Sequence, residues 1–136
     1  MSAGYSGTPL LKKLGIKAGQ ALYIQSAPEN YFELLGELPE DLQLRQRLTG
    51  KLDFVQLFVT RRKQLEKDFE RAKSILEPGG LLWISWPKGG AKAKIPTDLN
   101  ENIVREIGLD RGMVDIKVCA VDAIWSGLRF AFRKKL

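Results

Sequence analysis

The residue types that are missing limit the chemistry this chain can perform. The sequence contains no histidine, which excludes Ser-His, Cys-His and histidine–metal chemistry. Its single cysteine, Cys119, excludes an intramolecular disulfide and a cysteine-based zinc site. Apolar residues flank Cys119 and nothing nearby in the sequence would activate it, so we expect an unreactive thiol. We therefore predict no catalytic residue and no metal ligand, and whether the chain is an enzyme stays open.

Five residues are candidates for a ligand-binding site because they follow predicted strands or lie in a predicted hairpin connection. They are Asn30, Arg61, Lys88, Asp122 and Trp125. In an open α/β sheet, ligands bind beyond the carboxyl ends of the strands, where the strand order reverses. Helix N-termini at that edge carry partial positive charge and free N–H groups, which favour a phosphate or a carboxylate. A solvated helix end at Arg61 and a packed turn aromatic at Trp125 are the alternative interpretation.

Basic residues are concentrated in two stretches of the chain. There are 22 lysine and arginine residues against 16 acidic residues, a net charge of +6. Three lysines lie in one loop (Lys88, Lys92 and Lys94), and four basic residues lie near the C-terminus (Arg129, Arg133, Lys134 and Lys135). Such a concentration can mark an anion or nucleic-acid site, although a solvated loop and tail are the commoner explanation.

Strand and helix patterns alternate along the sequence. Buried strands are predicted at 21–25, 52–59 and 81–86, with a weaker edge strand at 42–48. Helices are predicted to begin at Thr8-Pro9, Pro28, Thr60 and Asp98 and to end at Gly15, Gly36, Pro78-Gly79-Gly80 and Gly108. Asp98 and Glu101 have the spacing of a capping box. Alternating apolar residues at 114–118 and 128–132, joined by the connection 122–127, predict an antiparallel hairpin.

This order of elements predicts one α/β domain over residues 1–136, with 1–7 as an N-terminal arm. Right-handed crossovers place helices on both faces of a mainly parallel sheet. We therefore expect a three-layer Rossmann-like sandwich, mostly parallel, with a C-terminal antiparallel hairpin. The longest apolar run, 81–86, is far too short to span a membrane, and residues 1–7 lack a secretory pattern. We expect a soluble, cytoplasmic protein without a membrane partner.

One segment resembles a passage of the class I methyltransferases. Residues 76–82 (LEPGGLL), followed by 86–88 (WPK), resemble their helix–turn–strand passage, and those proteins also end in an antiparallel hairpin. The resemblance covers roughly residues 52–133 and implies a methyltransferase-like fold. The family's glycine-rich loop for S-adenosylmethionine is replaced by 26–31 (SAPENY), and the acidic residue after the second strand is replaced by 47–50 (RLTG). We therefore expect no cofactor.

A second resemblance runs along nearly the whole chain. Its motifs are GYSGTPL at 4–10, WPK at 86–88, TDL at 97–99, VCAVD at 118–122 and WSGLRF at 125–130. On this combination the chain is identified as a member of a small bacterial family described as a domain of unknown function. The family implies no activity.

Three functions from different classes fit these observations. The first is a non-catalytic domain that binds an anionic small molecule or a protein partner at the strand-end crevice, which the missing histidines and the missing cofactor loop favour. The second is a divergent S-adenosylmethionine-dependent methyltransferase, which fits the fold. The third is a nucleic-acid-binding protein, which fits the charge but lacks a recognised motif and interleaved aromatic residues. The sequence predicts neither the ligand nor the oligomeric state.

Overall fold

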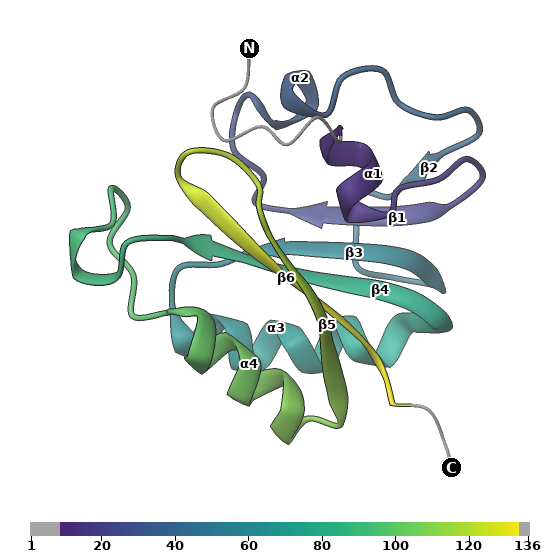
Figure 1. The fold of residues 1–136 in the computed structure, drawn as a ribbon. Helices are drawn as coiled ribbons and strands as arrows, with labels where there is room; N and C mark the ends of the chain where they lie inside the picture. Colours follow the sequence, from purple (N-terminus) through teal and green to yellow (C-terminus); the bar gives the residue numbers. More distant parts are fainter. Residues whose placement is uncertain (1–8, 134–136) are drawn as a thin grey trace.

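Residues 9–133, which the computed structural model describes, form a six-stranded sheet with helices on both faces (Figure 1). The predicted arm at 1–7 lies outside the described residues. The strand order is β2-β1-β3-β4-β6-β5. The strands are β1 (Ala21–Gln25), β2 (Gln43–Leu44), β3 (Leu52–Phe58), β4 (Leu76–Pro87), β5 (Met113–Ala120) and β6 (Trp125–Phe132). Neighbours among β2, β1, β3 and β4 are parallel, and β6 is antiparallel to β4 and β5. The predicted α/β fold with its closing hairpin is confirmed.

Two short helices cover one face of the sheet and two longer helices cover the other (Figure 1). The first pair is α1 (Leu10–Leu14) and α2 (Tyr31–Leu35), and the second is α3 (Arg62–Ile75) and α4 (Glu101–Asp110), with a short 3-10 turn η1 (Gly90–Lys92) before α4. Side chains alternate between the faces of a strand. In β3, Phe54 and Phe58 therefore pack toward α1 and α2, while Val55 and Leu57 pack toward α3 and α4.

The face under α3 and α4 holds the larger apolar core. Leu65, Phe69 and Ala72 recur at helical spacing on α3 and are fully buried. The ring of Phe69 meets that of Phe130 edge-on, with centroids 5.4 Å apart. On α4, Gly108 lies directly beneath Phe130, and a Cβ there would overlap the ring. The glycine therefore lets α4 approach the sheet closely, and the prediction that it ends the helix was wrong.

The start of α4 also differs from the prediction. Asn100, rather than Asp98, caps the helix, because its side-chain oxygen accepts the N–H of Ile103 at 2.9 Å. The carboxylate of Asp98 instead accepts the N–H of Arg62 at 2.7 Å, at the start of α3. The predicted capping box is thus wrong. Asp98 instead joins the segment before α4 to the start of α3.

Strand β4 begins five residues earlier than predicted. Leu76 pairs with Leu52 of β3, and the register shifts before Phe54 pairs with Leu81. The segment Pro78-Gly79-Gly80 therefore lies inside an irregular strand rather than in a turn. The predicted strand at 42–48 is reduced to two exposed residues, Gln43–Leu44, at the edge of the sheet.

Three helix starts were also placed too early. Pro9 occupies the cap position of α1 and is not its first residue. Helix α2 begins at Tyr31 rather than at Pro28, and Arg61 rather than Thr60 occupies the cap position of α3. None of the helices in the described part of the chain combines the length and apolar character that crossing a membrane requires.

Candidate functional site at the carboxyl edge of the sheet

The strand order reverses between β1 and β3. From β1 the chain moves outward to β2, returns to β3 on the other side of β1, and continues to β4. The parallel strands end at one edge of the sheet, which we call the carboxyl edge. The hairpin turn between β5 and β6 reaches this edge too, because the N–H of Lys88 donates to the carbonyl of Ile124 at 2.9 Å. This is the edge where open α/β sheets bind ligands.

Aromatic side chains pack over the end of β3 at this reversal point. Tyr31, the first residue of α2, is 0% exposed. Its ring meets Phe58 edge-on at 5.0 Å between centroids, and Phe58 meets Trp125 in the same way at 5.1 Å. The chain's own rings therefore occupy the space between α2, the end of β3 and the hairpin turn.

A buried chain of hydrogen bonds holds Tyr31 in place. Its hydroxyl donates to the side-chain oxygen of Gln56 on β3, and the amide nitrogen of Gln56 donates to the hydroxyl of Ser85 on β4 at 3.0 Å. Burial raises the pKa of Tyr31, and the nearby charge of Asp122 adds to the rise. The phenol therefore stays protonated and works as a donor that fixes the ring.

The five predicted site residues have different surroundings. Asn30 and Arg61 are exposed, and neither side chain caps the helix that follows it. Lys88 is also exposed. The carboxylate of Asp122 instead accepts the N–H groups of Ile124 and Trp125, at 2.8 and 2.7 Å, and so shapes the hairpin turn.

Trp125 is 8% exposed and belongs to the core. Within residues 9–133, no hydrogen bond or ion pair joins the side chains of Asn30, Arg61 and Lys88. Lys88, Asp122 and Trp125 do meet around the hairpin turn, through the bond of Lys88 to Ile124. The role of all five in ligand binding stays a prediction.

Exposed cations follow the ends of β3 and β4 at the carboxyl edge, and we call this group the basic rim. Its members are Arg61, Arg62, Lys63, Lys88, Lys92 and Lys94. The loop that carries the lysines returns to the start of α3, where the N–H of Asp98 and the hydroxyl of Thr97 donate to the carbonyl of Thr60, at 3.3 and 2.7 Å. Glu66 forms an exposed ion pair with Arg62 at 3.5 Å, which offsets little of the positive charge.

Sequence reasoning missed Tyr31, Phe58, Gln56 and Ser85. The contacts between them join residues 25 or more positions apart. One signal was available: Gln56 is a lone amide inside the apolar stretch 54–59, FVQLFV. A buried amide in a central strand requires hydrogen-bond partners on neighbouring elements.

No family model and no curated protein matches this sequence. Solved structures do match it. A SAM dependent methyltransferase from Aquifex aeolicus aligns with a TM-score of 0.63 at 17% identity, over 89% of this chain and 86% of that one. Magnesium protoporphyrin IX methyltransferase (ChlM) from Synechocystis PCC 6803, with bound SAH, gives 0.59 at 11% identity, over 91% and 78%. The ribosomal protein L11 methylase from Lactobacillus delbrueckii subsp. bulgaricus gives 0.56 at 12% identity, over 92% and 76%.

The chain has a methyltransferase-like fold. At these identities the likeness concerns the fold alone, and it confirms the fold that the segment 76–88 implied. It does not carry over the cofactor or the substrate of any of these proteins.

The residues at the carboxyl edge do not fit S-adenosylmethionine, the cofactor of the class I methyltransferases. The loop after β1 contains no glycine, and Ser26 there has a φ of 57°, a left-handed conformation that glycine adopts without strain. At the end of this loop, Tyr31 is buried where a ligand of the reversal point would lie. Strand β2 ends at Leu44 and is followed by Arg45, with no acidic residue before Asp53.

Proposed function

We propose that this chain is a non-catalytic domain of methyltransferase-like fold that binds an anionic small molecule or a protein partner at its carboxyl edge. The observation that carries the proposal is the burial of Tyr31 over the end of β3, held by Gln56 and Ser85. Because the chain's own rings occupy that space, a ligand would contact the surface above them. We assign that surface to Asn30 and the basic rim, which are exposed and follow the ends of the parallel strands.

The start of α3 supports the choice of an anion. Arg61, Arg62 and Lys63 are consecutive cations at the positive end of a 14-residue helix whose first turn has no acidic residue, and the carboxylate of Asp98, which accepts the N–H of Arg62, is one negative charge against these three. Cations are unfavourable at a helix N-terminus, by a few tenths to about 1 kcal/mol each. A bound phosphate or carboxylate would relieve this repulsion.

We also propose that the chain belongs to the small bacterial family of unknown function that its motifs resemble. This membership implies no activity. The divergent methyltransferase remains the second candidate, favoured by the fold of the solved structures that match. It requires Tyr31 and the loop 26–30 to move away from the ends of β1 and β3. Nucleic-acid binding is the third, favoured by the net charge of +6.

Lys88→Gln is expected to remove most of the thermal stabilisation that inorganic phosphate gives the protein, whereas Lys92→Gln and Lys94→Gln should retain it. The backbone of Lys88 is fixed to the hairpin turn through Ile124, next to the packed rings. The other two lysines lie farther along the loop, in and after η1. A ligand at 100 times its dissociation constant stabilises by about 2.7 kcal/mol, which thermal melts at constant ionic strength can measure.

Binding to duplex DNA is the outcome that would contradict this expectation. If Lys88, Lys92 and Lys94 contact DNA phosphates, log K should fall with log salt by about 0.9 per contact. The triple glutamine variant would then lower the slope by up to about 2.7. We expect weak DNA binding at physiological salt and no such change in slope.

A further inference from the structure

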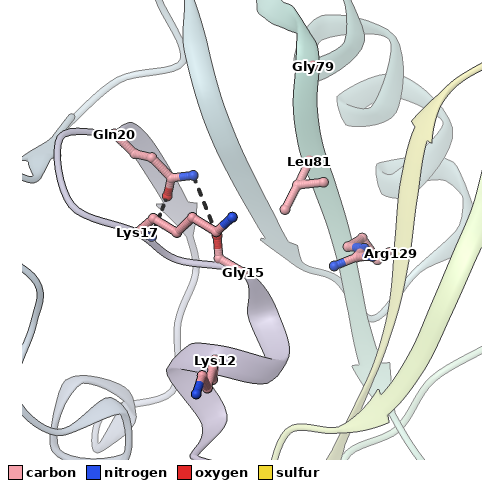
Figure 2. A pocket seen from close by; sticks show the side chains of 7 residues that line it. All are labelled: Lys12, Gly15, Lys17, Gln20, Gly79, Leu81 and Arg129. Atoms are coloured by element: carbon pink, nitrogen blue, oxygen red, sulfur yellow. Dashed lines mark hydrogen bonds between the residues drawn. The ribbon is translucent and has the colours of Figure 1, made fainter.

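A second concave site lies on the face of the sheet that α1 covers (Figure 2). It has a volume of about 410 Å³ and is lined by Lys12, Gly15, Lys17, Gln20, Gly79, Leu81 and Arg129. The residues from α1 and the following loop precede β1, and Gly79 and Leu81 lie in the first half of β4. The site, which we call the basic depression, is therefore beside the amino ends of the parallel strands, away from the basic rim.

The charges in the basic depression all have one sign. Lys12, Lys17 and Arg129 line it, and none of the carboxylates within residues 9–133 does. Figure 2 shows Lys17 and Arg129 extending their nitrogen atoms toward the gap from opposite sides, with Leu81 between them and Lys12 on the helix nearby. Like charges that share a partly enclosed space repel one another more strongly than they would in bulk water. An anion bound between them would attract each cation and so offset this repulsion.

The residues paired directly with Arg129 in the sheet are not acidic. In the register it lies between Trp83 of β4 and Lys117 of β5. Its Nε atom is buried and has no hydrogen-bond partner. None of the ion pairs within residues 9–133 includes Arg129. The guanidinium therefore adds to the cavity wall a positive charge that no carboxylate of residues 9–133 neutralises.

Hydrogen bonds hold the walls of the basic depression in place. The indole N–H of Trp83 donates to the carbonyl of Leu14 at 2.8 Å and so fixes the end of α1 on the sheet. The side chain of Gln20 accepts the N–H of Lys17 at 2.9 Å and donates to the carbonyl of Gly15 at 3.4 Å, which closes the loop (Figure 2). On the opposite wall, a Cβ at Gly79 would meet no atom within 4 Å. The walls are therefore formed before a ligand arrives, while the space at Gly79 stays open.

We propose that the basic depression binds the phosphate or diphosphate group of a small molecule. A guanidinium donates two parallel hydrogen bonds to a phosphate, and the two lysines add point charges that match a dianion or trianion. The volume suits a small phosphorylated metabolite rather than a polymer, which would need an extended basic stripe. This site goes beyond the proposed function, because it lies on other elements and shares no residue with the basic rim.

Calorimetric titration with pyrophosphate at constant ionic strength tests this site separately from the carboxyl edge. In the Lys88→Gln background, where binding at the basic rim is weakened, we expect one remaining binding event. Adding Lys17→Gln or Arg129→Gln should weaken it about tenfold or more, the loss of one charge-assisted hydrogen bond. The control is Lys67→Gln, an exposed residue of α3 that gives the same change in charge and should leave the affinity unchanged.

Three results would overturn the inference. Undiminished binding in both Lys17→Gln and Arg129→Gln would show that the phosphate binds elsewhere. If Lys67→Gln weakens the affinity for pyrophosphate equally, that affinity depends only on the net charge of the protein. Citrate binding as tightly as pyrophosphate would reject the assignment to phosphate. If Arg129→Gln fails to fold, Lys17→Gln decides, because Lys17 is exposed in a loop. If the unsubstituted protein shows no additional binding event that Lys88→Gln removes, the proposed function is rejected, and the inference about the basic depression is unaffected.

Discussion

Replacing Tyr31 with alanine is expected to lower the free energy of unfolding by about 3–5 kcal/mol, the usual cost of truncating a fully buried aromatic side chain. Tyr31 is 0% exposed, packs edge-on against Phe58 and donates a hydrogen bond to Gln56. The variant loses the buried ring and leaves the amide of Gln56 without its donor. Urea unfolding followed by circular dichroism measures the loss.

Phe32→Ala is the matched control for this prediction. Phe32 is the next residue of the same short helix, but its side chain is 42% exposed. Its truncation should cost less than about 1 kcal/mol, as is usual for surface positions. If the two variants are equally stable, Tyr31 does not fill the space over β3, and that space would be open to a ligand.

Gln56→Met is expected to lower the free energy of unfolding by about 2–4 kcal/mol, although it preserves the length and shape of the side chain. Gln56 accepts a hydrogen bond from Tyr31 and donates one to Ser85. Without the amide, two buried hydroxyls lose their partner, at about 1–3 kcal/mol for each unsatisfied group.

The pair Gln56→Met and Tyr31→Phe tests whether these residues act as one network. With Gln56 already replaced, removing the Tyr31 hydroxyl removes an unsatisfied group, so the double variant should be no less stable than Gln56→Met alone. Unfolding measurements on both single variants and the double variant give the coupling energy. Strictly additive losses would show that the hydroxyl and the amide do not depend on each other.

The architecture was predictable because its main signals are local. The apolar stretch 52–59, the glycines at positions 15 and 36 and the alternating pattern of the hairpin each specify one element. Their order and the right-handed crossover rule then leave few topologies. Boundaries that depend on tertiary pairing were not predictable. Leu76 joined β4 because it pairs with Leu52. Asp98 left its helix because its carboxylate accepts the N–H of Arg62, a donor at the start of α3 that has no partner within that helix.

The candidate site was predictable as a place on the fold but not as a set of contacts. Alternation along the chain brought Lys88, Asp122 and Trp125 to one edge. The alternating pattern does not indicate that the carboxylate of Asp122 accepts hydrogen bonds from the backbone of its own turn. Nor does it indicate that Trp125 packs against Phe58. The basic depression was missed entirely, because Lys12, Lys17 and Arg129 come from distant segments. The hairpin pattern predicted that Arg129 lies on a strand, as it does on β6, but it gave no sign that this side chain faces the end of α1.

The most direct test of the central claim is a calorimetric titration of S-adenosylmethionine into the purified protein. We expect no measurable heat of binding, because Tyr31 is packed over the end of β3, the loop 26–30 has no glycine and no acidic residue follows β2. The same ligand solution titrated into an active methyltransferase provides the positive control. A dissociation constant in the micromolar range for this chain would contradict the claim and favour the methyltransferase instead.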